Sequence, residues 1–309
     1  MDFENKKATR QSYGEALVEL GKINEKVVVL DADLAGATKT NMFAKEFPER
    51  FFDMGIAEQD MIATAAGLAT CNKIPYASTF AVFATGRVYD QIRNSICYPN
   101  LNVKICATHS GITVGEDGAT HQMLEDINLM RGLPNMTVIS PSDNTQSKWA
   151  VNEAAKIQGP VYIRFGRAAT PIIYDETTKF EFGKGIQFGE GTDATVFATG
   201  IMVAEALKAK EELEKEGINI RVVDIHAIKP IDTDIIVKSA METEKLISIE
   251  EHSIIGGLGS AISEVLTDKY PKKLIRLGMK DCFGKSGNAN ELLKYFGLTS
   301  KEIIEIIKS

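Results

Sequence analysis

A polar, glycine-rich stretch between residues 107 and 122 contains side chains that could do chemistry. ATHSG (107–111) and VGEDGATHQ (114–122) hold two of the four histidines in the chain. A loop with this many glycines and titratable groups is rarely built for packing alone. His109, Asp117 and His121 lack the compact helical spacing of an HExxH zinc site. The pattern therefore favours hydrogen bonding to a polyhydroxylated substrate over metal binding.

The four cysteines give no reason to expect a metal either. They lie far apart in the sequence and form no CxxC pair. Zinc sites built from cysteine need such closely spaced ligands. No metal ligand is therefore expected in this chain.

A second candidate is Glu58 in GIAEQ (55–59), which follows the strand-like FFDM and opens the apolar helix MIATAAGLA. A glutamate in the first turn of a helix has an ordinary explanation, because the helix dipole favours negative charge there. The functional alternative is its place at the carboxyl end of a strand, where open α/β sheets bind ligands. The pattern alone leaves both interpretations open.

A third candidate is STFAVF (78–83), in which Phe80 and Phe83 lie three residues apart. If the strand turns into a helix at this point, both rings could face one slot. Core packing is the ordinary interpretation. A flat heteroaromatic ligand stacked on the rings is the functional one.

The elements that must position these residues alternate between strand and helix. In the first unit, short β-branched strands are expected at 27–33, 74–83, 102–109, 136–142 and 161–167, and helices at 8–22, 56–70, 85–97, 122–131 and 143–157. In the second unit, strands are expected at 194–200, 218–226, 244–252 and 273–279, and helices at 201–216, 231–241, 258–269 and 289–295. This alternation predicts an α/β fold with two largely parallel sheets flanked by helices. The expected division is a domain at 1–180, a linker at 181–193 and a second domain at 194–309.

Composition and charge exclude several classes of protein. The 309 residues include 35 lysines and arginines against 42 aspartates and glutamates, a formal charge of −7, and no block of five basic residues. Nucleic-acid and acidic-membrane surfaces need clustered positive charge. No segment approaches the roughly 18 apolar residues of a membrane span, and the start lacks the apolar stretch of a secretory signal. We expect a cytoplasmic protein with a small-molecule ligand.

Six strings in order identify a family resemblance. ATRQS, DADL, GIAEQ, STFAVF, ATHSGITVGEDGATHQ and SPSD, at these intervals, resemble the carboxyl-terminal half of transketolases. The similarity covers nearly the whole chain, and the long histidine-containing string is specific to that enzyme. The resemblance implies a pyrimidine-binding domain followed by a transketolase C-terminal domain, and thiamine diphosphate as the cofactor.

The resemblance also assigns roles at the cofactor. Glu58 matches the glutamate that hydrogen-bonds the pyrimidine N1′, a contact that must exchange a proton, which an amide cannot do. Phe80 and Phe83 match aromatic residues that pack against the aminopyrimidine, and Asp33 and Leu34 fall beside the cofactor. Two positions depart from the family: Gly86 replaces a third aromatic residue, and Ala37 replaces a phosphate-contacting serine.

At the substrate, the resemblance implies a set of cations that grip the phosphate of a sugar. Arg10, His109 and Arg167 match this set, with Arg164 as the competitor for the last place. Asp117 and His121 match residues that hydrogen-bond the ketose hydroxyls and carbonyl region, and His121 and Asp117 join Glu58 as expected catalytic residues. Buried polar pairing of this kind selects for a hydroxylated donor.

A partner polypeptide is implied because the match is to half an enzyme. A full transketolase has an amino-terminal domain whose GDG motif holds magnesium and the diphosphate, and this chain contains no GDG. The expected assembly is a heterotetramer with two copies of each subunit, in which the terminal domain supports dimerisation. The expected reaction moves a glycolaldehyde unit from a ketose phosphate to an aldose phosphate.

Three alternatives remain. The β subunit of a 2-oxo acid dehydrogenase has a similar length, domain order and GIAEQ-like string, but less need for the histidine and aspartate set. The corresponding half of deoxyxylulose-phosphate synthase also carries a GxDGxTH string, and pyruvate dependence would reveal it. A silent regulatory or scaffold subunit could keep the fold, although it would have no reason to keep Glu58.

Overall fold

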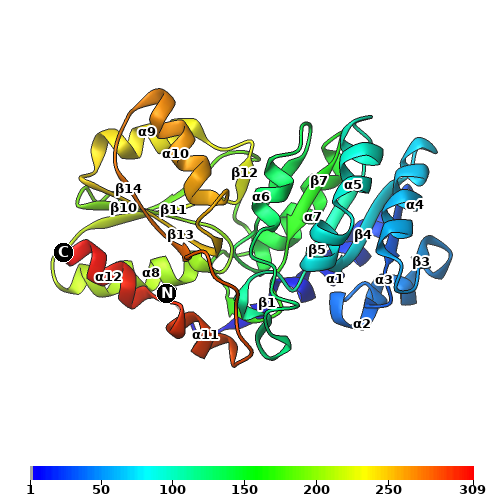
Figure 1. Cartoon of the computed structure of the whole chain (residues 1–309), viewed down its shortest axis with the longest axis horizontal. Coiled ribbons are helices and arrows are strands. Elements are labelled where there is room, and N and C mark those ends of the chain that lie inside the picture. The colour runs from blue at the N-terminus through cyan, green and yellow to red at the C-terminus, as the bar shows by residue number, and fades with distance from the viewer. Residues whose placement is uncertain (1–2) are drawn as a thin grey trace.

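The computed structural model describes residues 3–309, which form two α/β units lying side by side, as Figure 1 shows. Each unit has its own sheet with helices packed against it, as the alternating sequence pattern predicts. Among the described residues, no helix is long and apolar enough to cross a membrane.

The first sheet contains seven strands in the order β12-β6-β7-β5-β4-β2-β3. All neighbouring pairs are parallel except β12 with β6. The strands are β2 (Val27–Asp31), β3 (Phe51–Asp53), β4 (Ile74–Phe80), β5 (Lys104–Thr108), β6 (Thr137–Ile139), β7 (Val161–Arg164) and β12 (Ala227–Lys229). A separate antiparallel pair joins β1 (Lys6–Ala8) to β8 (Ala169–Pro171).

The parallel arrangement explains why the candidate residues meet. Glu58 comes after β3, Phe80 ends β4, and His109 follows β5, so all three lie at the carboxyl edge of one sheet. Phe80 is in register with Thr108 on the neighbouring strand. Residues far apart in the sequence are thereby brought to the edge at which α/β sheets bind ligands.

Helices cover both faces of the first sheet. They are α1 (Thr9–Ile23), α2 (Ala35–Thr38), α3 (Asn41–Glu46), α4 (Glu58–Thr70), α5 (Tyr89–Gln91), α6 (Asp126–Arg131) and α7 (Asn144–Lys156). Asp143 caps α7 by accepting a hydrogen bond from the Gln146 amide at 2.8 Å. The helix expected at 85–97 is found in three segments, in which the π-helical turns η2 (Val82–Arg87) and η3 (Ile92–Cys97) lie on either side of α5.

The second sheet contains five strands in the order β14-β13-β10-β11-β9. These are β9 (Ile186–Phe188), β10 (Ala194–Ala198), β11 (Ile220–Asp224), β13 (Lys245–Ser253) and β14 (Leu274–Met279). The helices of this unit are α8 (Met202–Lys215), α9 (Thr233–Glu242), α10 (Leu258–Lys269), α11 (Ala289–Tyr295) and α12 (Ser300–Lys308). Sequence analysis did not anticipate α12, which a capping box between Thr299 and Glu302 initiates.

The two units are connected by strand pairing as well as by the chain that joins them. The stretch 181–193, expected to be a linker, contains β9, which pairs antiparallel with β11 of the second sheet. Strand β12, which lies within the second expected domain, instead extends the first sheet by pairing with β6. Backbone hydrogen bonding therefore ties the second half of the chain to the first.

Candidate active site

Glu58 opens α4 and is almost fully buried, with 3% of its surface exposed. A carboxylate in this position benefits from the free amides and dipole of the helix N-terminus. Its neighbour Ile56, two residues earlier, is 77% exposed. The carboxylate therefore lies just beneath an open and partly apolar surface.

Arg87 contacts Glu58, and sequence analysis did not identify this arginine. Its Nη1 donates to Glu58 Oε1 at 2.7 Å, and its guanidinium carbon lies 4.4 Å from the centre of the Phe83 ring. Arg87 follows Phe83 by four residues, a helical spacing that could have indicated the contact. A planar group with N–H donors is thus held against both the carboxylate and the ring.

Four aromatic rings, including that of Phe83, pack together beside Arg87. Phe80 and Phe83 are stacked with ring centres 6.0 Å apart, and His109 stacks on Phe80 at 3.7 Å. His121 presents its edge to Phe83 at 5.6 Å and to Phe80 at 6.4 Å. The two phenylalanines and the two candidate histidines therefore form one cluster.

Arg10, near the start of α1, lies at the far side of His109. Its Nη1 is 3.5 Å from His109 Nε2 and donates to the Ala37 carbonyl at 2.8 Å. Burial, together with the charges of Arg10 and Arg167, lowers the pKa of His109 to about 3. The imidazole is neutral at physiological pH, which differs from the expectation that it acts as a phosphate-binding cation.

The neutral imidazole of His109 has a defined tautomer. Arginine can only donate hydrogen bonds, so Nε2 accepts from Arg10. Nδ1 then carries the proton and donates to the hydroxyl of Thr108, 2.9 Å away. His109 is therefore a fixed hydrogen-bonding group.

The structure separates the roles of Arg164 and Arg167. Arg164 is buried and bonds Asp126 at 2.7 Å and the Glu251 carbonyl at 2.8 Å. Arg167 is partly exposed and donates from Nη1 to the Val114 carbonyl at 2.5 Å and to Glu116 at 2.6 Å. Arg167 is therefore the one of the two that a ligand can reach.

Asp117 and His121 belong to the glycine-rich segment that follows β5. Asp117 ends the 3-10 turn η4 (Ile112–Asp117), is exposed, and has no side-chain hydrogen bond among residues 3–309. His121 Nδ1 lies 3.0 Å from the Thr120 hydroxyl. The structure brings His121 to the rings and leaves Asp117 at the rim.

The DADL segment is organised by Asp31, which sequence analysis did not single out. Asp31 accepts hydrogen bonds from the hydroxyls of Thr38 and Thr40 and from the Leu34 amide, at 2.7 to 2.8 Å. Burial raises the pKa of Asp31 to about 6. Asp33, in contrast, is exposed and adopts a left-handed backbone with φ of 60°.

A second tie brings the DADL segment toward Glu58. The carboxylate of Asp53, at the end of β3, accepts from the amide of Asp33 at 3.2 Å and from the amide of Gly55 at 3.0 Å. The segment that carries Asp33 and Leu34 is thereby linked to the turn that leads into α4. Both candidates consequently lie near the entrance to the Glu58 site.

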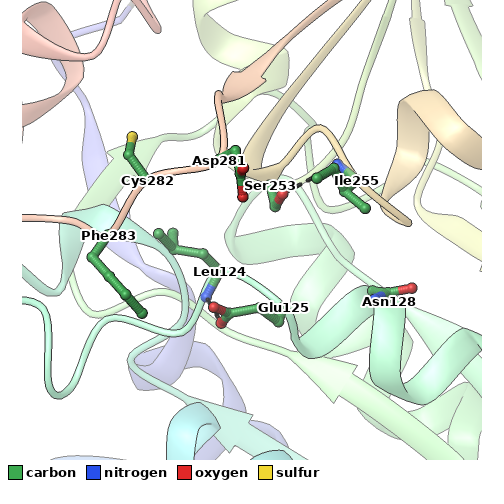
Figure 2. Close-up of a pocket in the computed structure, with 8 residues that line it drawn as sticks. All are labelled: Leu124, Glu125, Asn128, Ser253, Ile255, Asp281, Cys282 and Phe283. Atoms are coloured by element: carbon green, nitrogen blue, oxygen red, sulfur yellow. Dashed lines mark hydrogen bonds between the residues drawn. The ribbon is translucent and has the colours of Figure 1, made fainter.

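A separate cavity of about 230 Å³ lies at the seam between the two units. Figure 2 shows that Leu124, Glu125 and Asn128 line one side of it, and that Ser253, Ile255 and the segment 281–283 line the other. Neither Glu58 nor the ring cluster lines this cavity. Among residues 3–309, no group of three or more His, Cys, Asp or Glu side chains is placed to hold a metal ion.

Comparison with known proteins identifies the family. The model named "Transketolase, pyrimidine binding domain" matches residues 5–172, and "Transketolase, C-terminal domain" matches residues 183–303. The chain belongs to the transketolase family. Transketolases depend on thiamine diphosphate, as the sequence strings imply, and the α/β fold with two mostly parallel sheets is confirmed.

The relatives include proteins of similar length to this chain. A Methanocaldococcus jannaschii protein described as a transketolase C-terminal section is 54% identical over 304 residues, covering 97% of this chain and 95% of that protein. A 6-deoxy-6-sulfo-D-fructose transketolase subunit from Clostridium sp. (strain MSTE9) is 43% identical, covering 96% and 92%.

A solved structure and a longer relative complete the comparison. The structure "Split gene transketolase, inactive beta4 tetramer" has a TM-score of 0.91 and 54% identity, covering 97% of each chain. Human transketolase is 38% identical over 98% of this chain, but the chain spans only 49% of the human protein. This transketolase chain thus resembles the C-terminal section of an enzyme that can be divided between two polypeptides.

The residues around Glu58 fit the aminopyrimidine part of thiamine diphosphate. Arg87 already places a flat, nitrogen-rich group with an N–H donor against the Glu58 carboxylate and the Phe83 ring. An aminopyrimidine is also flat and rich in nitrogen. The acid and the ring therefore supply the two kinds of contact that such a ring needs.

Proposed function

We propose that this chain is the C-terminal subunit of a two-chain transketolase that moves a glycolaldehyde unit from a ketose phosphate to an aldose phosphate. The observation that carries the proposal is the buried Glu58 carboxylate beside Phe83, with a planar cation held against both. A subunit retained only as a scaffold has no need to keep a buried acid at an open edge, since burying a charge is costly even where it is paired.

The residues around Glu58 act on the cofactor. Thiamine diphosphate, when bound, supplies the carbon nucleophile for the two-carbon unit. Glu58 holds a ring nitrogen of the aminopyrimidine and exchanges a proton with it at a carboxylate oxygen. Phe80 and Phe83 provide an apolar wall that excludes water, and the lower local dielectric strengthens the Glu58 hydrogen bond.

The other end of the ring cluster recognises the sugar phosphate. Arg10 and Arg167 provide positive charge for the terminal phosphate, and their proximity is reflected in the pKa of Arg10, which burial and the charge of Arg167 lower. Neutral His109 orients the Arg10 guanidinium by accepting its hydrogen bond. Asp117 and His121 hydrogen-bond the hydroxyls and the carbonyl region, which disfavours donors that leave these groups unpaired.

A partner polypeptide completes the site. Phe52 and Ile56, on either side of the β3–α4 turn, are 39% and 77% exposed, and exposed apolar side chains at a ligand site are suited to a covering surface. We assign the ligands for Mg²⁺ and for the diphosphate to an N-terminal subunit carrying the GDG motif. The proposed assembly contains two copies of each chain.

The test is reconstitution with the GDG-containing partner chain. Xylulose 5-phosphate and ribose 5-phosphate are supplied with thiamine diphosphate and Mg²⁺, with and without the partner. We expect a seven-carbon ketose phosphate only when both chains are present. Absence of product from a correctly assembled complex would contradict the proposal.

Two additional substrates separate the alternatives. Consumption of pyruvate would indicate the deoxyxylulose-phosphate synthase or 2-oxo acid dehydrogenase reaction instead. A ketose with a terminal sulfonate tests the anion site, because two arginines can bind either oxyanion. We expect the phosphate donor to be preferred.

A further inference from the structure

The glycine-rich loop of the site is covered by the C-terminal unit. Ile112 is fully buried and packs in the same apolar cluster as Met279 and Leu292 of that unit. The loop that begins after β5 is therefore part of the second unit's core as well as part of the site.

The glycines of this loop mark the places of closest approach between the units. A Cβ at Gly111 would collide with the Glu251 carboxylate, and one at Gly118 would collide with the hydroxyl of Ser286. Both glycines also have left-handed backbones, with φ of 74° and 76°. Their absence of a side chain is needed for the second unit to close on the loop.

Glu251, near the end of β13, forms the central hydrogen bond between the second unit and this loop, and we call such a hydrogen bond a tie. Glu251 is 3% exposed, and its Oε1 accepts a hydrogen bond from the Thr113 amide at 2.6 Å. Gln122 adds a second tie, because its Nε2 donates to the Ile112 carbonyl at 3.0 Å and to the Lys285 carbonyl at 2.8 Å.

A third tie lies at the cavity at the seam. The amide of Ser253 donates to the Leu124 carbonyl at 2.9 Å, and Figure 2 shows both residues among those that line that cavity. Both ends of the segment 112–124 are therefore fixed by the second unit.

The same segment presents the groups assigned to the sugar phosphate. Asp117 and His121 lie within it, and the carbonyl of Val114, adjacent to Thr113, accepts from Arg167 at 2.5 Å. A shift of the Thr113 amide would consequently move the Arg167 contact and the turn that ends at Asp117.

We propose that Glu251 is a positioning residue for the sugar phosphate, acting across the domain interface through the Thr113 amide without touching substrate. The proposal rests on the function proposed above. It gives the C-terminal unit a part in substrate binding in addition to any role in assembly.

Replacing Glu251 by glutamine provides a rescue variant. Burial raises the pKa of Glu251 to about 7, so the folded protein tolerates a neutral side chain there near neutral pH. Glutamine keeps an oxygen that can accept from the Thr113 amide, whereas methionine has a similar volume and no comparable acceptor.

The experiment compares Glu251→Met, Glu251→Gln and the control Glu250→Met in the assembled two-chain enzyme. Glu250 is the adjacent buried residue, but it accepts from the amides of Leu258 and Gly259 within its own unit. The measurements are KM for xylulose 5-phosphate, kcat, and the dissociation constant of thiamine diphosphate from calorimetry.

We expect Glu251→Met to raise KM about tenfold, the effect of losing one buried hydrogen bond. The cofactor dissociation constant should remain within about twofold of wild type, because the Thr113 tie lies on the sugar side of the site. Glu251→Gln should restore KM, and Glu250→Met should lower thermal stability without raising KM.

A second variant, Gln122→Met, keeps the test decisive if Glu251→Met does not assemble, since it removes the neighbouring tie and should raise KM in the same way. If the wild-type enzyme is active while Glu251→Met and Gln122→Met keep the wild-type KM or behave like Glu250→Met, that result would overturn this inference and leave the proposed function standing. An inactive wild-type assembly would overturn the proposed function and this inference with it.

Discussion

Arg87 Nη1 donates a 2.7 Å hydrogen bond to Glu58 Oε1 while its guanidinium lies on the face of Phe83. Glu58 is buried, and the Arg87 side chain is 46% exposed. The arginine thus neutralises a carboxylate that would otherwise be buried and unpaired. It also occupies the place that the proposed function gives to the aminopyrimidine.

Replacing Arg87 should therefore alter cofactor binding. In the two-chain assembly, Arg87→Gln is expected to tighten thiamine diphosphate binding by about two- to fivefold, because a partly exposed ion pair worth up to about 1 kcal/mol no longer competes. Calorimetric titration measures the change. The control is Arg93→Gln, since Arg93 is exposed and, among residues 3–309, its side chain bonds its neighbour Asn94 alone. Unchanged or weaker binding by Arg87→Gln would argue against competition.

Glu58→Gln should abolish most turnover and leave the fold intact. The amide can still accept the Arg87 hydrogen bond but cannot exchange a proton, so kcat should fall at least about a hundredfold. Steady-state rates of the assembled enzyme, with thermal unfolding followed by circular dichroism, provide the measurement. Near-normal turnover from a folded variant would refute the role of the carboxylate.

Asp117→Ala should affect donor selectivity and have little effect on folding, because the side chain is exposed and unbonded among residues 3–309. KM is expected to rise about tenfold for two-carbon donors that have the matching hydroxyl stereochemistry. Donors differing only at that hydroxyl supply the comparison. An equal loss on every donor would count against a hydroxyl contact.

Asp224 provides a test of pH-dependent stability away from the site. Its Oδ2 accepts from Ser142, Gln146 and Tyr174 at 2.8 to 3.0 Å, and burial raises its pKa from 3.8 to about 7. Between these values the unfolded chain has lost the proton that the folded chain keeps. The free energy of unfolding contributed by Asp224 therefore falls as the pH rises from about 4 to 7.

Asparagine does not titrate, so the free energy of unfolding of Asp224→Asn should increase relative to wild type over the same pH range. Urea unfolding at pH 5 and pH 7.5 measures the difference. The exposed Asp268, replaced by asparagine, is the control and should show no such trend. A difference between Asp224→Asn and wild type that stays constant with pH would contradict the assignment.

Much of the local structure was predictable because it depends on short-range pattern. The strand expected at 27–33 and the helix expected at 143–157 are found as β2 and α7. The π-helical turns after Phe80 were not expected, since hydrophobic spacing in 85–97 fits a continuous helix. Strand β12 was missed because its partner, β6, lies about 90 residues earlier in the chain.

The sequence by itself determined the family and the α/β class, in which parallel strands bring the segments that carry Glu58, Phe80 and His109 to one edge of the sheet. Only the tertiary structure decided that Arg87 pairs with Glu58 and that Arg164 is buried against Asp126. It also decided that Glu251 holds the Thr113 amide across 138 residues. Charge state and pairing depend on burial and on neighbours from distant segments, and linear spacing encodes neither of these.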